Sequence, residues 1–402
     1  MTLKEELEVL RGEPIKVVTG DPMDIPCIET SNAEKLCKHP VVSVNMITYN
    51  HEPYIRQAIE GVMMQKTDFE FELVIGEDAS TDKTREICFE YQKKYPDKIR
   101  VLWWHENLYR NPHPAGGNGK RTQAHCRGEF IALCEGDDYW IDPLKLQKQV
   151  DVMRKYPNVG LCFCGSKIFQ QNRGTWMEWD EKRAGFAPGL IPSRKYVLWT
   201  MFGRHADRAF GPEFFIMTAT TMYRTSVLKR ASETYELFRW RLMIGDSVFC
   251  IGAGSLGDVY YLSEPMSVYR VTSTGLTSTR TGEGTRDTLL VRAYYAACVF
   301  GLTWGDFPAR WLDALCEALV SWLKMQTPAF CRHYMRRCCS IGQGRRIFLR
   351  FGALPYAAAL SLGLMRPIVL RQCWRWMFRV FMGTAIPPRL RRLYEECEDG
   401  QV

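Results

Sequence analysis

Short apolar runs alternate with amphipathic segments over the first third of the chain. Segment 53–65 carries apolar residues at helical spacing, with Pro53 suited to a first helical turn, and 80–95 does the same, with Ser80 or Thr81 as its cap. Before, between and after them stand runs with the length and composition of strands buried on both faces: 41–48, 71–76, 99–104 and 129–134. This alternation predicts an α/β fold with a Rossmann-like, mostly parallel sheet flanked by helices.

The pattern becomes less regular further on. A strand is predicted over 214–224 after a loop-rich region, then a helix beginning at 245–254 and two short strands at 259–262 and 266–270. From about Thr288 the apolar residues recur three and four apart, as in helices.

Three regions follow from this pattern. We predict an irregular lead-in over 1–38, an α/β domain over 39–286 and a helical, arginine-rich region over 287–402.

The composition of the chain indicates the cellular compartment in which it is expected. The apolar content of 46% supports a real core, and the 15 cysteines are odd in number and scattered, which indicates reduced core residues. The first residues lack an apolar signal stretch, and no window approaches an uninterrupted apolar span. We therefore expect a cytoplasmic protein that is neither exported nor membrane-spanning.

Polar clusters follow three of the predicted strands, at 48–52, 76–82 and 135–138. In doubly wound sheets ligands bind beyond the carboxyl ends of the strands, where such clusters converge. A single cluster of this kind could instead cap a helix, but several on one sheet favour a binding site.

The cluster at 135–138 has adjacent carboxylates, Asp137 and Asp138, that repel each other. Mg²⁺ or Mn²⁺ would offset this repulsion, and such ions take further ligands from substrate phosphates. A metal that neutralises a leaving diphosphate acts as a Lewis acid. The sequence therefore predicts transfer of a group from a nucleotide diphosphate.

Other residues are candidates with open alternatives. Glu77 or Asp78 could accept hydrogen bonds from a base or a ribose, or their loop could cap a helix. Asp246 could be a general base or could complement a helix dipole. Arg270 could contact a diphosphate or lie at the surface.

Four segments in order, "VSVNMITYNHEPYIRQAIEGVMMQ", "ELVIGEDASTDKT", "GEFIALCEGDDYWIDPLKLQKQV" and "GDSVFCIGAGSLGDVYYLSEPMSVYR", resemble the family 2 glycosyltransferases with the GT-A fold. The resemblance spans about residues 40–275. It implies inverting transfer of a hexosyl or related sugar from a nucleotide-sugar, with Mg²⁺ or Mn²⁺.

The resemblance also implies roles for single residues. The nucleoside would be held by Thr48, Tyr49 and Glu77 or Asp78; the metal and diphosphate by Asp137 with Asp138 or Glu135; Asp246 would be the base and Arg270 a diphosphate contact. Glu77 and Glu135 stand where the family often has aspartate, and Gly245 precedes Asp246 where a glutamate is common.

The function expected from the resemblance is sugar transfer from a nucleotide-sugar, with a UDP-sugar as the first expectation, to a glycan or lipid-linked acceptor in bacterial cell-surface polysaccharide synthesis. Two alternatives stay open. One is an inactive carbohydrate- or nucleotide-binding scaffold. The other is a sugar nucleotidyltransferase, which would be expected to carry a glycine-rich, basic loop after the first strand, where this chain has "TYNHEP".

The net charge of +8 is concentrated near the end of the chain. Residues 331–392 carry 13 Arg and no Lys, Asp or Glu, so the rest sums to −5. Arg371, Arg375 and Arg379 recur every four residues among aromatic ones, which suits a peripheral helix on the inner, anionic face of a membrane. A solvated helix face or a subunit contact would give the same pattern. No nucleic-acid-binding signature is present, and we predict no nucleic-acid partner.

Overall fold

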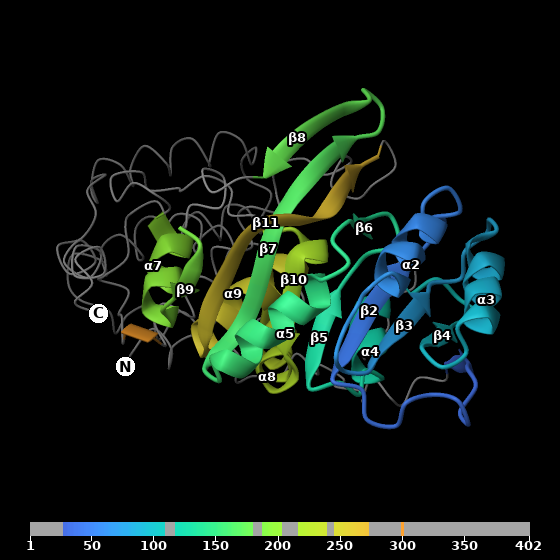
Figure 1. Cartoon of the computed structure of the whole chain (residues 1–402), viewed down its shortest axis with the longest axis horizontal. Helices are drawn as coiled ribbons and strands as arrows, with labels where there is room; N and C mark the ends of the chain where they lie inside the picture. The colour runs from blue at the N-terminus through green and yellow to red at the C-terminus, as the bar shows by residue number, and fades with distance from the viewer. Residues whose placement is uncertain are drawn as a thin grey trace, which may run out of the picture.

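The structure, a computed structural model, describes residues 27–108, 117–179, 187–202, 216–238, 245–272 and 299–300 (Figure 1). Within these residues one sheet has 11 strands. The strands are β1 (Ile28–Thr30), β2 (Val42–Thr48), β3 (Phe71–Glu77), β4 (Ile99–Trp103), β5 (Phe130–Leu133), β6 (Tyr139–Trp140), β7 (Val159–Gln170), β8 (Thr175–Trp179), β9 (Gly189–Ile191), β10 (Thr221–Arg224) and β11 (Asp258–Val271). Their order is β1-β4-β3-β2-β5-β10-β7-β11-β6, with β8 on β7 and β9 on β11.

Four neighbouring strands, β4-β3-β2-β5, are parallel to one another. These are the four strands predicted from the apolar runs, and every residue of β3 is buried, as expected for a strand covered on both faces. The α/β fold with a flanked parallel sheet is therefore confirmed. Beyond β5 the sheet becomes mixed, because β10 and β6 run antiparallel to their neighbours.

Helices cover both faces of this sheet. They are α2 (Ile55–Met63), α3 (Thr84–Lys94), α4 (Asn118–Ala124), α5 (Lys145–Lys155), α7 (Ser193–Phe202), α8 (Thr225–Phe238) and α9 (Gly245–Leu256). The apolar residues of α2, α3 and α5 form one core cluster with the sheet. Those of α7, α8 and α9 form a second cluster on the opposite face.

Several predicted elements differ from the structure. Of the strand predicted over 214–224, residues 214–215 lie outside the described part of the chain. The rest holds a 3₁₀ turn, η2 (Thr218–Thr220), and then the strand β10, so only the last four residues are confirmed as a strand. The two strands predicted at 259–262 and 266–270 are one strand, β11, because pairing with β7 continues across register shifts around Pro265. The lead-in contains β1, an edge strand of three residues with too few apolar positions to stand out.

The expected caps of α3 are also wrong. Its N-cap is Lys83, and the first helical N–H, that of Thr84, donates to Asp82 Oδ1 at 3.0 Å. Ser80 and Thr81 instead contact Asn50 across the loops.

Two further expectations concern the described residues as a group. All eight cysteines in the described ranges are free, as expected for reduced residues. No helix in that part of the chain has the length and apolarity needed to cross a bilayer. The arginine-rich segment 331–392 lies outside the described residues.

Candidate functional site

The loops that follow β2 and β3 are fastened together at the carboxyl edge of the sheet. The Asp78 N–H donates to the Thr48 carbonyl at 3.0 Å. The backbone N–H groups of Asn50, His51 and Glu52 donate to the side chains of Ser80 and Asp82 in the other loop and of Thr84 at the start of α3, at 2.8 to 3.1 Å. These bonds fix two of the predicted polar clusters relative to each other before any ligand binds.

Two non-glycine residues in these loops have left-handed backbones. Asn50 has φ of 53° and Ala79 has φ of 57°. Asparagine tolerates this region, but alanine adopts it at a cost of order 1 kcal/mol or more. Such strain is held in place by the surrounding hydrogen bonds and is common where backbone geometry serves a ligand.

The loop after β5 packs directly against the end of β2. The Gly136 N–H donates to the Ile47 carbonyl at 2.9 Å. A Cβ at Gly136 would lie 2.6 Å from Thr48 Oγ1 and 2.9 Å from His51 Nδ1, so only glycine permits this approach. Both of those polar atoms are buried without a hydrogen-bond partner. The polar cluster at 135–138 thus lies beside those at 48–52 and 76–82.

The acidic residues of this loop differ in exposure. The side chain of Asp137 is 22% exposed, whereas Asp138 is 1% exposed and its Oδ2 has no hydrogen-bond partner. Burial and the charges of Asp137 and Glu135 raise the pKa of Asp138 well above its usual range. Among the described residues no three His, Cys, Asp or Glu side chains form a ready metal-binding group.

Arg270 is the cationic partner of this acidic loop. Its N–H donates to Asp138 Oδ1 and its Nε to the Asp137 carbonyl, both at 2.8 Å. Its Nη atoms reach Gln171 and Gln57, and its guanidinium lies over the rings of Tyr54 and Tyr139 at 4.8 and 5.1 Å. The structure therefore brings Arg270 to Asp137 and Asp138, although it lies more than a hundred residues from them in sequence.

The carboxylates predicted to hold a nucleoside take part in their own loops. Glu77 is fully buried, accepts from the Ser80 N–H at 2.6 Å and pairs with Arg85 Nε. Asp78 Oδ1 accepts from the Leu108 N–H at 2.7 Å. Tyr49 is partly exposed beside the buried Thr48. These contacts place all four residues at one edge of the sheet, and their contact with a nucleoside stays a prediction.

Asp246 is the second residue of α9. A tight turn at Gly257 joins α9 to β11, and α9 packs against β7 and β11. The helix therefore runs back along the sheet, and its first turn points toward the end of β11 that carries Arg270. The side chain of Asp246 is outside the described part of the structure, so its role as a base stays a prediction.

Sequence reasoning missed several residues of this site. His51 Nε2 lies 3.9 Å from Asp137 Oδ2. Burial lowers the pKa of His51, although the negative charges of Asp137 and Asp82 act to raise it. Gln57 and Tyr54 meet Arg270 from α2 and its preceding turn. His51 stands inside the first polar cluster and could have been found there. The other two carry no sequence signal, because only the packing of α2 beside β6 brings them to the site.

Comparison with known proteins finds a matching family model and several relatives. Residues 43–231 match the family model described as glycosyl transferase family 2. The protein Rv1520 of Mycobacterium tuberculosis is 32% identical over 229 residues, which are 57% of this chain and 58% of that protein. A glycosyltransferase of Nostoc sp. is 33% identical over 231 residues, which are 57% of this chain and 64% of that protein. The chain thus spans less than two thirds of these relatives.

Two further similarities are more distant. TuaG of Bacillus subtilis, whose name refers to teichuronic acid biosynthesis, is 30% identical over 135 residues, covering 33% of this chain and 49% of TuaG. Among solved structures, a fragment of S. aureus TarS in complex with UDP-GlcNAc has a TM-score of 0.48 and 18% identity, covering 89% of this chain and 92% of that one.

Proposed function

Because this chain belongs to glycosyltransferase family 2 through residues 43–231, we propose that it transfers a sugar from a nucleotide-sugar to a glycan or lipid-linked acceptor in cell-surface polysaccharide synthesis. One observation carries the proposal: a fixed arginine adjoins a buried acidic loop, so groups for an anion and for a cation lie side by side. A metal-bound diphosphate needs both.

The acidic loop fits a divalent cation. Carboxylates are the hard oxygen ligands that Mg²⁺ and Mn²⁺ prefer, and one or two suffice when substrate phosphates and water complete the shell. Asp137, with Asp138 or Glu135, would hold the ion. Asp138 Oδ2 has no hydrogen-bond partner, and the pKa of Asp138 is raised. A nearby cation would contact this oxygen and lower that pKa. When bound, the ion stabilises the charge that develops on the leaving diphosphate.

Arg270 is suited to the diphosphate itself. Its Nη1 and Nη2 contact two neutral amides, at 3.1 Å to Gln171 and 2.7 Å to Gln57. Charge-assisted bonds to phosphate oxygens are stronger than bonds to amides, so a diphosphate can replace them. Bonds from the backbone N–H and Nε of Arg270 keep the residue in place during that exchange.

In the transfer, Asp246 is proposed to take the proton of the acceptor hydroxyl while that oxygen attacks the anomeric carbon and the bond to the diphosphate breaks. Thr48, Tyr49, Glu77 and Asp78 are proposed to surround the nucleoside. A UDP-sugar is the first donor to test. We further propose that residues 331–392 contact an anionic membrane surface from the cytoplasmic side.

The deciding experiment measures nucleotide release from a panel of UDP- and GDP-sugars, with and without Mn²⁺ or Mg²⁺. We expect metal-dependent release that Asp137→Asn reduces about 100-fold, since a metal ligand is lost, while Asp142→Asn leaves it unchanged. Nucleotide binding without turnover would favour the inactive scaffold. Absence of both release and calorimetric binding of UDP or GDP would refute the proposal.

A further inference from the structure

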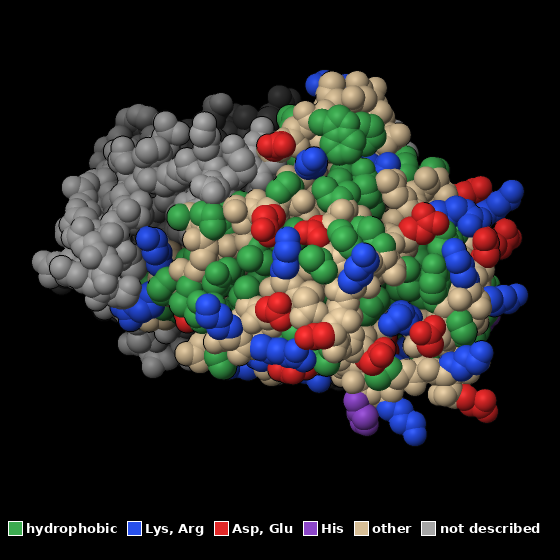
Figure 2. Space-filling view, in the orientation of Figure 1, with side chains coloured by type: hydrophobic (Ala, Val, Ile, Leu, Met, Phe, Trp, Pro, Cys, Tyr) green, Lys and Arg blue, Asp and Glu red, His purple; other side chains and the backbone are tan. Residues whose placement is uncertain are grey.

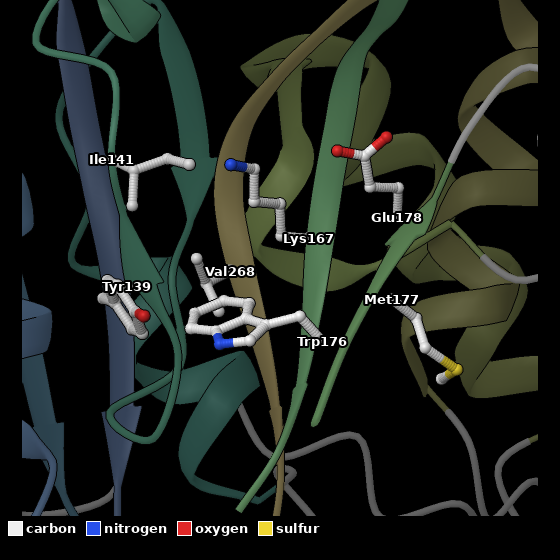
Figure 3. A pocket seen from close by; sticks show the side chains of 7 residues that line it. All are labelled: Tyr139, Ile141, Lys167, Trp176, Met177, Glu178 and Val268. Carbon is white, nitrogen blue, oxygen red and sulfur yellow. The ribbon is translucent and has the colours of Figure 1, made fainter. Parts of the chain in front are cut away.

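A cavity of about 580 Å³, within the size range of small-molecule sites, is lined in part by Tyr139, whose ring also contacts Arg270. Residues of β6, β7, β8 and β11 line it (Figure 3). It includes part of a protruding hairpin, β7 with β8, that Figure 1 shows extending beyond the rest of the sheet. None of the roles proposed for donor binding and catalysis uses this cavity.

Strand register explains which side chains meet there. Lys167 on β7 lies opposite Glu178 on β8 and beside Val268 on β11, and Val268 in turn lies opposite Tyr139 on β6. These four side chains form one cross-strand row along the wall of the cavity.

A second row runs parallel to the first, two residues further along β7. Phe169 lies opposite Trp176 on β8 and beside Arg270 on β11. Residues two apart on a strand share a face, so Trp176 and Arg270 face the same side as the cavity. Neighbouring strands are about 4.8 Å apart, which places Trp176 about 10 Å, or two strand spacings, from Arg270.

Tyr139 connects the cavity to the site. Its ring lies 5.1 Å from the Arg270 guanidinium carbon and also lines the cavity. In Figure 3 the indole of Trp176 points toward Tyr139 and Val268, with Lys167 and Glu178 on the same side of it. A ligand in the cavity would therefore adjoin the proposed diphosphate position.

The chemistry of the walls favours a sugar. Trp176 is 54% exposed, the most exposed of the large hydrophobic side chains described, and Phe169 supports it at 4.5 Å between ring centroids. Figure 2 shows hydrophobic side chains gathered over this hairpin. A pyranose ring presents C–H bonds to an aromatic face and hydroxyls at its rim, where the ammonium of Lys167 and the carboxylate of Glu178 can donate and accept. An acyl chain offers no polar group to either of these charged side chains.

We propose that this cavity is the acceptor site and that it binds one pyranose ring of a glycan stacked on Trp176. The inference rests on the proposed function and specifies it further: the carbohydrate part of the acceptor, and not a lipid tail, is what the cavity recognises.

The test is saturation-transfer NMR on the full chain with methyl glycosides of glucose, galactose, mannose and N-acetylglucosamine, together with octyl β-glucoside. We expect ring protons of at least one glycoside to receive saturation. Trp176→Ala should weaken that binding roughly five- to tenfold, as loss of a stacking contact implies, and Trp176→Phe should restore most of it. The matched control is Leu190→Ala, a substitution at another exposed hydrophobic residue, on β9 outside the cavity, which should change nothing.

Three results would overturn this inference. They are the absence of any glycoside signal, a signal that Trp176→Ala leaves unchanged, and Trp176-dependent saturation confined to the octyl chain of octyl β-glucoside. Calorimetric UDP binding, measured on the same variants, separates the two proposals. If wild type and Trp176→Ala bind UDP equally, a missing glycoside signal counts only against the acceptor site.

Discussion

At the scale of single residues, Arg270 is positioned before any substrate binds. Its backbone N–H and Nε bond to the acidic loop, its Nη atoms bond to two glutamines, and two tyrosine rings flank its guanidinium. Groups that stabilise developing charge are most effective when they need no reorganisation during the reaction. This fixed position supports the role of Arg270 at a leaving diphosphate.

Arg270→Lys is the sharpest test of that role. Lysine keeps the charge but loses the planar fork and the Nε bond, so nucleotide release should fall about 100-fold. Arg56→Lys is the control, because Arg56 pairs with Glu90 at the exposed surface and should leave the rate unchanged. Equal rates for the two variants would show that Arg270 does not act on the diphosphate.

At the scale of elements, a buried charge network joins the strands at the edge opposite the site. Glu72 of β3 is 1% exposed and accepts from Ser43 of β2 at 2.6 Å, from Arg127 Nη2 at 2.6 Å and from Arg100 Nη1 of β4 at 3.2 Å. Burial alone would raise the pKa of Glu72, but the bonds from Arg127 and Ser43 and the charge of Arg100 lower it. The network therefore holds three strands in register.

Glu72→Gln should lower the free energy of unfolding at pH 7 by about 3 kcal/mol, because it removes the buried carboxylate that Arg127 and Arg100 share and leaves Arg100 with Glu29 alone. A carboxyl group whose pKa is lower in the folded than in the unfolded protein stabilises the folded state at pH values above its unfolded pKa, about 4.3 for glutamate. This stabilisation disappears as the pH falls through the pKa of the folded state. Urea unfolding should thus show a difference from wild type that shrinks below about pH 4.

Glu70→Gln is the control for this prediction. Glu70 lies two residues away, but its side chain is 66% exposed and its Oε2 is 3.6 Å from Lys98 Nζ. The free energy of unfolding should therefore change by less than about 0.5 kcal/mol. A similar loss for both variants would mean that the buried network contributes no more than surface charge.

The packing of α2 against β6 depends on a second glycine. A Cβ at Gly61 would lie 2.8 Å from the Trp140 nitrogen and 2.9 Å from its carbonyl oxygen. Gly61→Ala should therefore destabilise the protein by about 2 kcal/mol, although alanine favours helices. A Cβ at Gly119 in α4 would meet only the Ile47 side chain, at 3.9 Å, so Gly119→Ala should leave the stability unchanged or raise it slightly. Thermal unfolding of both variants checks this; a stabilised Gly61→Ala would refute the close contact.

At the scale of the whole molecule, charge is unevenly distributed. On the face shown in Figure 2, Lys and Arg side chains alternate with Asp and Glu over the described surface. The arginine excess belongs to residues 331–392 in the sequence. Membrane contact is therefore proposed for that segment and not for the described residues.

Replacing Arg371, Arg375 and Arg379 together with Gln should weaken co-sedimentation with phosphatidylserine vesicles, because each arginine near an anionic surface contributes about 1 kcal/mol. Binding of the wild type should also fall as salt increases. The control replaces Arg56, Arg154 and Arg173 of the described domain with Gln and should bind as wild type does. Equal loss in both triple variants would indicate non-specific charge attraction.

The sequence alone determined the class of fold and where along the chain the candidate polar residues stand. Runs such as 41–48 and 71–76 are mostly apolar, which is typical of strands covered on both faces, and the polar clusters at their ends follow from the chain leaving the core there. The residue types and their order at Thr48, Asp137, Asp138 and Arg270, together with the family resemblance, predicted the candidate site.

The tertiary structure decided how these groups meet. The mixed half of the sheet, the joining of two predicted strands into β11 and the row from Arg270 to Trp176 all depend on pairing between distant segments, which local patterns do not encode. Gln57, Tyr54 and the hairpin cavity likewise became part of the site only through packing. Residue types determine which chemistry is available, whereas contacts between distant segments determine which groups share a site.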